Sequence, residues 1–502
     1  MPTRARNWLT PAAWVAAVTA ALLLLFPVGF PNYDTIYALV WGREMAHGLS
    51  PDYGAALPPT PHPLADLLGL VTTPLGDGAI TVTMAIAYLS LGLIGFLVYR
   101  LGTIWFDRWI GIVAAAIVLT RAPFLSNGIR AYIDLPYIAL CLGALTIEAK
   151  RTRAGWPVLA LLVPAGLLRP EAWLFAGVYW LYLAIEIELP PPKGWAAARP
   201  HWRRERSPRQ LAWLAALAVA GPLLWVVFDA ITTGEPLYSW TGTKETVETL
   251  ERKTGPVDLV LYGPRALGEV LQWPGMVGAF GGLVLGFAFL RRRSALGIAA
   301  VVLSLGAFAL LAVGGLAILA RYTMLAAAVL AIFAAVALLG WRLLEPGHAW
   351  RRRWQLFAGV VLLMFAIWLP NQWDLDSQVN TDLSNQAKIE NELTDLVDAG
   401  AFEPACGPIA VPNHRAIPRL AFGLEVKPTE IVSASEAISK PEEKSKLAEA
   451  GYYVIPASEF VVHNFVLDPN DPTNPHFEAP PGFTEATRNE SWIVYRSPDC
   501  LR

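Results

Sequence analysis

Four short segments of this chain place carboxylate and guanidinium groups beside apolar runs. The segment "FPNYDTIYALVWGREMAHGLSPDY" puts Asp34 directly after the first of these runs. A carboxylate in such a place can take the proton from an attacking hydroxyl group. A guanidinium group binds phosphate through several directed donors. The other three segments supply Arg130 and Asp134 in "IRAYIDLPY", Arg169 and Glu171 in "LLRPEAW", and Arg321 and Tyr322 in "ARYTM".

These charges have ordinary explanations when each is taken alone. Asp34 could be only a helix N-cap, and Arg169 with Glu171 could be an internal ion pair. However, charges at membrane depth usually face a cavity or a water path, and short spans beside them indicate backbone lined by protein. Because all the segments lie on one predicted side, the sequence predicts a polar cavity there. Such a cavity suits a lipid phosphate with a sugar headgroup.

The elements that must hold this cavity are membrane spans. Of the 502 residues 55% are hydrophobic and 16% are charged, against about 25% charged in a soluble domain. No basic stripe suggests nucleic acid as a partner. About eleven apolar runs predict a polytopic α-helical membrane protein, although several are shorter than the ~20 residues of a free-standing span. The runs are Trp8–Phe30, Ala79–Tyr99, Trp109–Thr120, Leu135–Ile147, Trp156–Leu168, Ala172–Ile185, Leu211–Ile231, Met276–Leu290, Ala295–Val313, Tyr322–Leu339 and Leu356–Leu369.

Lysine and arginine predict the orientation of these spans, because cytoplasmic loops are enriched in both. The N-terminus is then cytoplasmic and the C-terminus is extracytoplasmic. We expect the chain to lie in the plasma (inner) membrane. The first run lacks a cleavage site and is expected to remain as an anchor. The basic residues of alternate loops are Arg4, Arg6, Arg100, Arg108, Lys150, Arg151, Arg153, Lys193, Arg199, Arg203, Arg204, Arg206, Arg209, Arg291, Arg292, Arg293, Arg342, Arg351, Arg352 and Arg353.

The first outer loop is expected to hold a helix lying in the membrane interface. Periodicity predicts this helix over Thr35–His47, with Asn32 or Asp34 as its N-cap. Glu44 and His47 are expected on its solvated surface. The residues of its apolar side are Ile36, Leu39, Val40 and Met45.

The chain becomes more polar after its last apolar run. "GPIAVPN", "TEIVSA", "GYYVIPA" and "SWIVYR" predict short strands. We therefore expect a transmembrane domain over residues 1–369, with its first outer loop at 31–78, and a soluble extracytoplasmic α/β domain over 370–502. Cys406 and Cys500 could form a disulfide there or remain free thiols, since spacing alone does not decide.

This layout resembles the GT-C superfamily of integral-membrane glycosyltransferases, over about Trp8–Leu369. In that superfamily an acid just after the first span is the catalytic base, and Asp34 matches it. A second acid follows in the next outer loop, matched by Asp134. "LLRPEAW" and "ARYTM" are similar to segments of such enzymes, and an added outer α/β domain is common. Many members have paired acids in the first loop, whereas "PNYDT" has one. Whether a divalent cation is a cofactor is therefore undecided, because "PNYDT" offers no second acidic ligand for it.

The resemblance implies transfer of a hexose or pentose from a polyprenyl-phosphate sugar to a glycan, lipid or protein hydroxyl at the outer membrane face. Asp34 would be the base, most simply with inversion. The phosphate would be held by Arg130, Arg169 and Arg321, with Asp134, Glu171 and Tyr322 also binding substrate.

A transporter or flippase of a polar lipid is the alternative. The sequence shows no inverted repeat to support it. A third hypothesis, an anchored sensor with a working outer domain, does not explain the buried charges.

Overall fold

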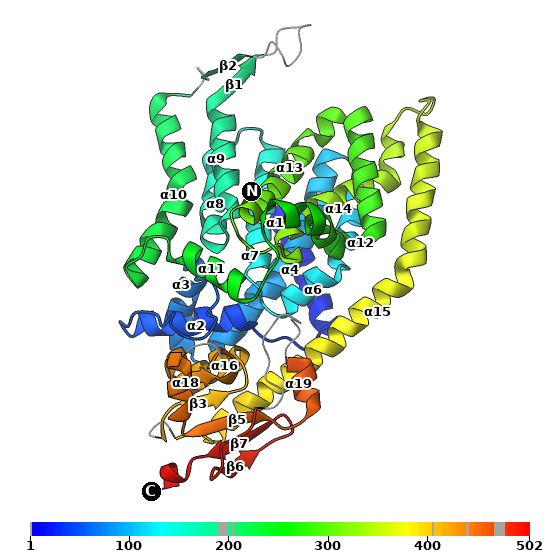
Figure 1. Ribbon diagram of the computed structural model, residues 1–502. Coiled ribbons are helices and arrows are strands. Elements are labelled where there is room, and N and C mark those ends of the chain that lie inside the picture. The colour runs from blue at the N-terminus through cyan, green and yellow to red at the C-terminus, as the bar shows by residue number, and fades with distance from the viewer. Residues whose placement is uncertain are drawn as a thin grey trace.

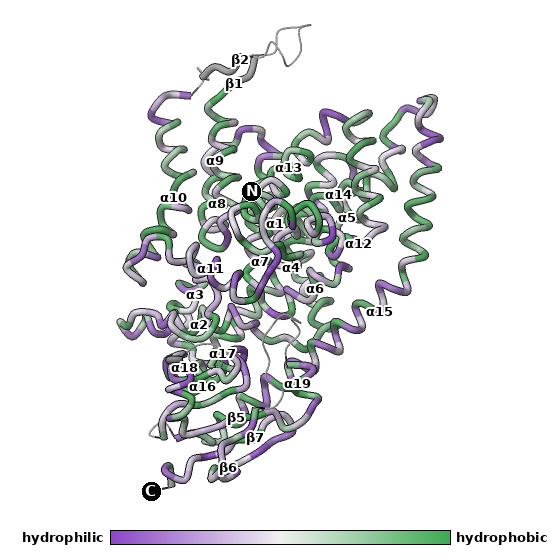
Figure 2. The backbone as a smooth tube through the Cα atoms, in the orientation of Figure 1, coloured by the Kyte–Doolittle hydropathy of each residue, from purple (hydrophilic) through white to green (hydrophobic). Residues whose placement is uncertain are grey.

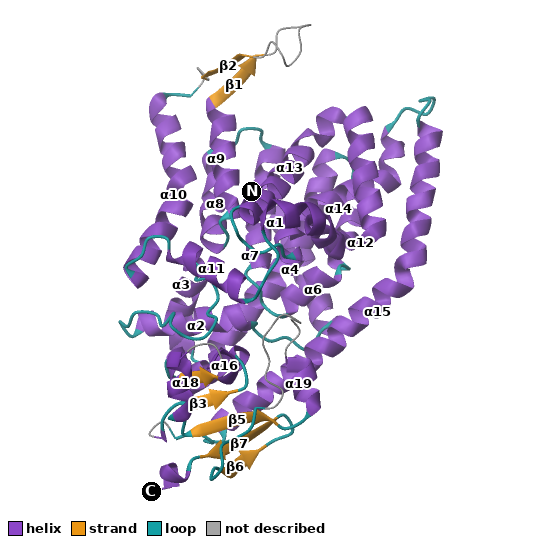
Figure 3. Cartoon of the chain, viewed as in Figure 1, coloured by secondary structure: helices purple, strands orange, loops and turns teal. Residues whose placement is uncertain are grey.

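The computed structural model describes residues 3–188, 199–202, 206–403, 406–437, 441–465 and 477–501. Most of these residues are helical, and a small sheet lies near the C-terminus (Figure 3). Three residues predicted to lie in a cytoplasmic loop, Lys193, Arg203 and Arg204, fall outside the described residues.

The helices run side by side through most of the molecule (Figure 1). The helices up to the middle of the chain are α1 (Thr3–Leu25), α2 (Tyr33–Ala46), α3 (Pro63–Thr72), α4 (Gly78–Trp105), α5 (Arg108–Leu119), α6 (Ala122–Ile129), α7 (Asp134–Lys150), α8 (Trp156–Leu168), α9 (Glu171–Ala184) and α10 (Pro208–Thr233). Those that follow are α11 (Tyr238–Thr249), α12 (Gly255–Phe289), α13 (Arg291–Val313), α14 (Met324–Leu339), α15 (Arg351–Asp398), α16 (Ile417–Leu424), α17 (Ala434–Ala437), α18 (Pro441–Ala448) and α19 (Glu459–Phe465).

Each predicted apolar run falls largely within one of these helices. Among the described residues, six helices are long and apolar enough to cross a membrane, and a seventh span results if the bent pair α5 and α6 counts as one. The chain is thus a multi-pass membrane protein, while the number eleven stays a prediction. The six segments are Gly78–Trp105, Pro208–Thr233, Gly255–Phe289, Arg291–Val313, Ala320–Leu343 and Arg351–Asp398.

Arg121 stands at the break between α5 and α6, where the two helix axes differ by 61°. Its Nε donates to the carbonyl of Ile117 at 3.2 Å, which satisfies an end of α5. Its Nη1 donates to Oε1 of Gln272 at 3.4 Å, at a residue of α12 with non-helical backbone (φ 58°). Arg121 therefore connects the break between α5 and α6 with the break inside α12 through its hydrogen bonds.

Helix α2 confirms the predicted helix of the first outer loop, but its surroundings differ from those expected. Every residue from Thr35 to Glu44 is buried, not only one apolar side. Gly42 faces Gly69 of α3, and a Cβ atom at either position would meet the backbone of the other helix. The expectation of a solvated Glu44 is wrong. Its carboxylate accepts a hydrogen bond from the backbone N of Asp52 at 2.7 Å, and burial raises its pKa.

Helix α15 continues without interruption through the predicted domain boundary at residue 369 and ends at Asp398. Its first half is apolar and its second half is polar (Figure 2). Beyond it lies a five-stranded sheet in the order β4-β3-β5-β7-β6, with β3 parallel to both neighbours and β7 antiparallel to both of its own. These strands are β3 (Ile409–Val411), β4 (Ile431–Ser433), β5 (Tyr452–Pro456), β6 (Thr484–Arg488) and β7 (Trp492–Arg496).

The four predicted strands are thus confirmed as β3, β4, β5 and β7. Strand β6 was not predicted, since its largely exposed and polar sequence "TEATR" gives no strand signal. A hairpin of β1 (Ile185–Glu188) and β2 (Arg199–Trp202) was also missed. Cys406 and Cys500 are free thiols, and Sγ of Cys500 lies 3.5 Å from the carbonyl oxygen of Cys406.

Loops predicted to share a side of the membrane contact one another. Asp107, between α4 and α5, lies 3.9 Å from Arg342, which follows α14. Arg293 of α13 donates to the carbonyl of Phe106 at 3.4 Å. We call the end formed by these loops, by the β1–β2 hairpin and by the start of α15 the basic end. It lies opposite the C-terminal sheet (Figure 1).

Candidate active site

Asp34 lies in the first turn of α2, but it does not cap that helix. The cap is Asn32, whose side-chain oxygen accepts from the backbone N of Asp34 at 2.8 Å and of Thr35 at 3.2 Å. The explanation of Asp34 as an N-cap is therefore wrong, and its carboxylate is available for another purpose.

The start of α2 is fastened to the turn between α6 and α7. The backbone N and Nδ2 of Asn32 donate to the carbonyl of Arg130 at 2.8 and 2.9 Å. Oγ1 of Thr35 donates to the carbonyl of Ala131 at 2.8 Å. Ala131 has a φ of +53°, an uncommon conformation for a residue with a side chain, so the turn is held in a defined and costly shape. Two predicted outer loops thereby meet beside Asp34.

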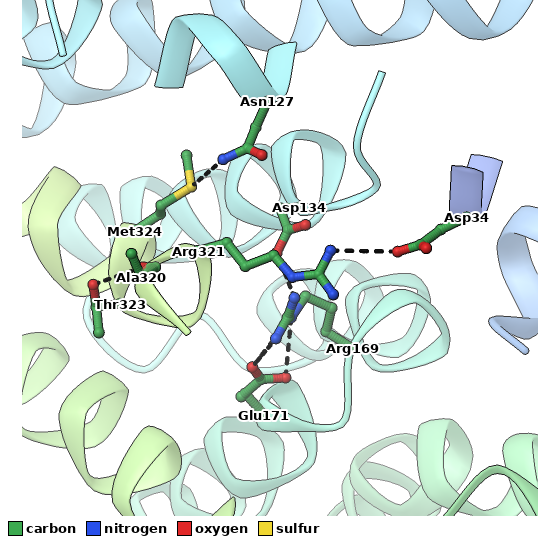
Figure 4. A network of polar contacts seen from close by, with 9 residues as sticks. All are labelled: Asp34, Asn127, Asp134, Arg169, Glu171, Ala320, Arg321, Thr323 and Met324. Carbon is green, nitrogen blue, oxygen red and sulfur yellow. Dashed lines mark hydrogen bonds and ion pairs between the residues drawn. The ribbon is translucent and has the colours of Figure 1, made fainter. Parts of the chain in front are cut away.

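The carboxylate of Asp34 faces Arg321, which follows α13 (Figure 4). Nη1 of Arg321 lies 3.3 Å from Oδ2 of Asp34, and both side chains are 24% exposed. Nε of Arg321 is buried and has no hydrogen-bond partner among the described residues. The rings of Tyr132 and Tyr322 lie 5.3 Å from its guanidinium carbon. Arg321 thus combines an open ion pair with unused donor capacity.

Arg169 is more completely enclosed. Its Nη1 pairs with Asp134, and its Nη2 and Nε donate to Oε1 of Glu171 at 2.5 and 3.1 Å. All three side chains are buried, and the ring of Tyr322 lies 4.2 Å from the guanidinium carbon. Because its donors already serve two carboxylates, Arg169 is better suited to support the site than to hold a phosphate. The alternative of an internal Arg169–Glu171 contact is confirmed.

Arg130 lies at the edge of the same group. Its Nη2 donates to Oγ of Ser126 at 2.9 Å, and its guanidinium carbon is 5.1 Å from the ring of Tyr132. Since Arg321 also stacks on Tyr132, this ring links the two arginines. All the residues predicted to form the site therefore gather between the starts of α2, α7, α9 and α14.

His62 belongs to this group and was not predicted as a site residue. It precedes α3 in the proline-rich "LPPTPHPLADLLG". Burial, followed by the charges of Arg169 and Arg321, lowers the pKa of His62 to about 3. Its ring is therefore neutral at physiological pH, and its Nδ1 has no hydrogen-bond partner among the described residues. The only sequence feature that could have drawn attention to His62 is the proline on each side of it, because flanking prolines indicate a rigid turn.

An apolar cavity of about 380 Å³ adjoins the site. It lies between α2, α3 and α4 and extends to Tyr132, the ring that contacts Arg321. An apolar space beside a guanidinium suits a ligand with an apolar chain and an anionic end. Residues on its walls include Thr35, Leu64, Leu68, Ile86, Ala131 and Leu168.

Among the described residues, the charged partner of Asp34 is the guanidinium of Arg321. The described part of the chain contains no group of three or more histidine, cysteine, aspartate or glutamate residues that could hold a metal ion.

Comparison with solved structures identifies the architecture. No protein-family model and no curated protein sequence matches the chain. ArnT from Cupriavidus metallidurans bound to undecaprenyl phosphate is similar with a TM-score of 0.56 and 14% identity, over 97% of this chain and 98% of that one. This chain has the GT-C glycosyltransferase fold.

Two further GT-C structures resemble the chain. Mycobacterial arabinofuranosyltransferase AftD has a TM-score of 0.52 and 15% identity, over 96% of this chain and 40% of that one. The apo oligosaccharyltransferase of Archaeoglobus fulgidus has a TM-score of 0.50 and 13% identity, over 89% of this chain and 70% of that one. The predicted resemblance is confirmed as a likeness of fold.

Proposed function

We propose that this chain transfers one sugar, a hexose or a pentose, from a polyprenyl phosphate to a hydroxyl group of a glycan, lipid or protein. The GT-C fold supports glycosyl transfer, and one similar structure contains a polyprenyl phosphate. The proposal depends on the pair of Asp34 and Arg321. The carboxylate of Asp34 does not cap α2, and it lies beside the guanidinium of Arg321, whose Nε has no hydrogen-bond partner among the described residues.

In the proposed reaction Asp34 takes the proton of the acceptor hydroxyl. The acceptor oxygen then forms a bond to the anomeric carbon of the sugar, and the bond from that carbon to the phosphate oxygen breaks. The electron pair remains on the polyprenyl phosphate, where Arg321 stabilises the developing charge. Attack from the face opposite the phosphate inverts the anomeric carbon.

The direct contact between Asp34 and Arg321 must open during this cycle, because the sugar lies between base and phosphate. A donor phosphate that pairs with Arg321 would replace Asp34 as its partner. Asp34 would then accept a proton from the second substrate instead. The ion pair would thus keep the base occupied until the donor is bound. We expect neutral His62 and the ring of Tyr132 to contact the sugar or the phosphate.

A buried group of charged residues is proposed to position Asp34 and Arg321. Arg169 with Asp134 and Glu171 fixes the starts of α7 and α9, and its guanidinium supports the ring of Tyr322 next to Arg321. The reaction would take place at the outer face of the plasma membrane, where the domain over 370–502 would contact the acceptor. This orientation follows from the distribution of lysine and arginine.

The test is sugar transfer by an Asp34→Asn variant, using a polyprenyl-phosphate sugar as donor. Asparagine cannot act as a base, so transfer should fall by ~10²–10⁴-fold. The melting temperature should stay close to that of the wild type, because Asn32 and not Asp34 caps α2.

Asp77→Asn is the matched control. It makes the same change at an exposed residue of the same predicted loop, and it should leave transfer unaffected. Near-normal transfer by Asp34→Asn would contradict the assignment of Asp34 as the base. A protein that moves the lipid donor across vesicles without forming any glycosidic product would support the transporter instead.

A further inference from the structure

A second and larger cavity lies toward the basic end. Its volume is about 690 Å³, and it is bordered by α4, α7, α8, α9, α13 and α14. Protein interiors are close-packed, so a space of this size in a membrane protein is ordinarily filled by a molecule with an apolar part. Apolar residues on its walls include Ala144, Leu145, Leu162, Phe175, Leu296 and Leu303.

The extent of the cavity along α13 corresponds to one leaflet of a bilayer. It reaches from Arg292 to Ser304, a rise of twelve residue steps or about 18 Å along the helix. The hydrocarbon core of a membrane is roughly 30 Å thick, so this length is a little more than half of it. Ala295 and Ala299, which lie on the cavity, are exposed, so the space opens at the surface of α13. An acyl chain can therefore enter from the side.

Guanidinium groups lie at and next to this cavity. Arg292 and Arg293 border it directly from α13. From the turn after α7, Arg153 lies over the ring of Tyr182, a wall residue, at 4.7 Å, and Arg206 donates to the carbonyl of Arg153 at 2.8 Å. These four arginines have no ion pair with a carboxylate among the described residues.

One acidic side chain, Glu148 of α7, also borders the cavity. Its carboxylate accepts hydrogen bonds from the backbone N of Arg153 at 2.6 Å, from that of Ala154 at 3.1 Å and from the hydroxyl of Tyr179 at 2.6 Å. Glu148 thus holds the turn that presents Arg153 and does not pair with Arg292 or Arg293. The mouth as a whole keeps an excess of positive charge.

We propose that this cavity binds one anionic glycerophospholipid from the leaflet at the basic end. One acyl chain would lie along α13, and the phosphate would be bound between Arg292, Arg293 and Arg153. Basic pockets between spans recognise anionic headgroups in this manner. The site is separate from Asp34 and Arg321, and it does not depend on the proposed transfer reaction.

The experiment is native mass spectrometry and thermal unfolding of the purified full chain, with added phosphatidylglycerol or with phosphatidylcholine of identical acyl chains. The wild type should retain phosphatidylglycerol and gain thermal stability from it, while phosphatidylcholine does neither. In an Arg292→Gln/Arg293→Gln variant, retention of phosphatidylglycerol should fall roughly tenfold or more, as expected for lost hydrogen bonds to a charged group.

Two further variants make the outcome decisive. Arg352→Gln/Arg353→Gln removes the same charge from exposed positions at the start of α15, and it should retain the lipid like the wild type. Ala299→Phe places a ring in the path of the acyl chain at an exposed position, so it should reduce retention with all arginines intact. This variant also decides the question if the arginine variant does not fold.

Three results would overturn the proposal. Equal retention of both phospholipids would show that the mouth does not recognise an anionic headgroup. Displacement of phosphatidylglycerol by equimolar undecaprenyl phosphate, with the same dependence on Arg292 and Arg293, would assign the cavity to the carrier lipid. Unchanged retention in Ala299→Phe would place the lipid elsewhere on the protein.

Discussion

At the scale of single residues, the two central arginines of the site differ in what they can still bind. Arg169 directs its donors at Asp134 and Glu171, whereas Arg321 makes one ion pair of 3.3 Å and keeps a buried Nε without a partner. A guanidinium with spare donors can receive a phosphate, and one saturated by carboxylates stabilises the fold. The same residue type therefore has two proposed purposes within one site.

Conservative substitutions should separate these purposes. Arg321→Lys keeps the charge but loses directed, two-point hydrogen bonding, so KM for the donor should rise about 10- to 100-fold with little change in melting temperature. Arg169→Lys cannot serve both Asp134 and Glu171, so it should mainly lower the melting temperature. Steady-state kinetics and calorimetry measure the two effects. An equal rise in KM for both variants, at unchanged stability, would indicate that Arg169 also holds the phosphate.

His62 should make stability depend on pH. Its folded-state pKa of about 3 is below the ordinary value of about 6.5, so the unfolded chain binds more protons between these values. Stability is therefore fully present above about pH 6.5 and is lost as the pH falls. At pH 5 the loss would be at most about 2 kcal/mol.

A His62→Gln variant removes this titration. The difference in melting temperature between pH 7.5 and pH 5 should be smaller in the variant than in the wild type. An identical difference in both proteins would show that His62 is protonated in the folded state or that its shift is small.

At the scale of elements, the position of Asp34 depends on how α2 begins. Asn32 both caps α2 and donates to the carbonyl of Arg130. One side chain therefore fixes the start of α2 against the turn before α7, where Asp134 lies. Gly42 and Gly69 allow α2 and α3 to approach closely, which brings His62 to the same place.

Asn32→Ala tests this arrangement. Loss of an N-cap costs about 0.5–2 kcal/mol, and transfer should fall as well because Asp34 moves relative to Arg321. Asp107→Ala is the matched control, since Asp107 caps α5 with bonds of 2.8 and 2.9 Å at the basic end. It should reduce stability to a similar degree and leave transfer nearly unchanged. Full activity of Asn32→Ala would show that the cap does not position the base.

At the scale of the whole molecule, contacts between residues far apart in the sequence connect α16 and the turn before β4 with the first loop. Arg43 donates to the carbonyls of Ala421 and Phe422 at 2.8 and 2.7 Å. Asp52 accepts from the backbone N and Oγ1 of Thr429 at 2.9 and 2.6 Å. The C-terminal part therefore covers α2, and an acceptor bound to it would lie close to Asp34.

The proposed orientation predicts the signals of topology reporters. Fusions after Arg204 and Arg352 should report cytoplasm, and a fusion after Ala457 should report the outer side. The reason is the excess of lysine and arginine in the loops of the basic end. Alkaline phosphatase and fluorescent-protein fusions measure this directly. A cytoplasmic signal after Ala457 would remove the proposed outer-face chemistry.

The sequence by itself determined the features that arise from local patterns. Apolar runs became helices, four alternating segments became strands, and charges predicted on one side came together, because hydropathy and charge act through every short window of the chain. The contact between Asp34 and Arg321, which are separated by 287 positions, is not contained in any such window.

Only the tertiary structure decided which group each polar side chain serves. Asn32 and Asp34 are both able to cap a helix, and the choice followed from the carbonyl of Arg130, 98 positions away. Glu44 was expected at a solvated surface, but the C-terminal part and α3 bury α2. The partners of Arg169 and the charged surroundings of His62 likewise come from other elements. Hydrogen-bond pairing and burial depend on distances between remote segments, which a linear pattern does not contain.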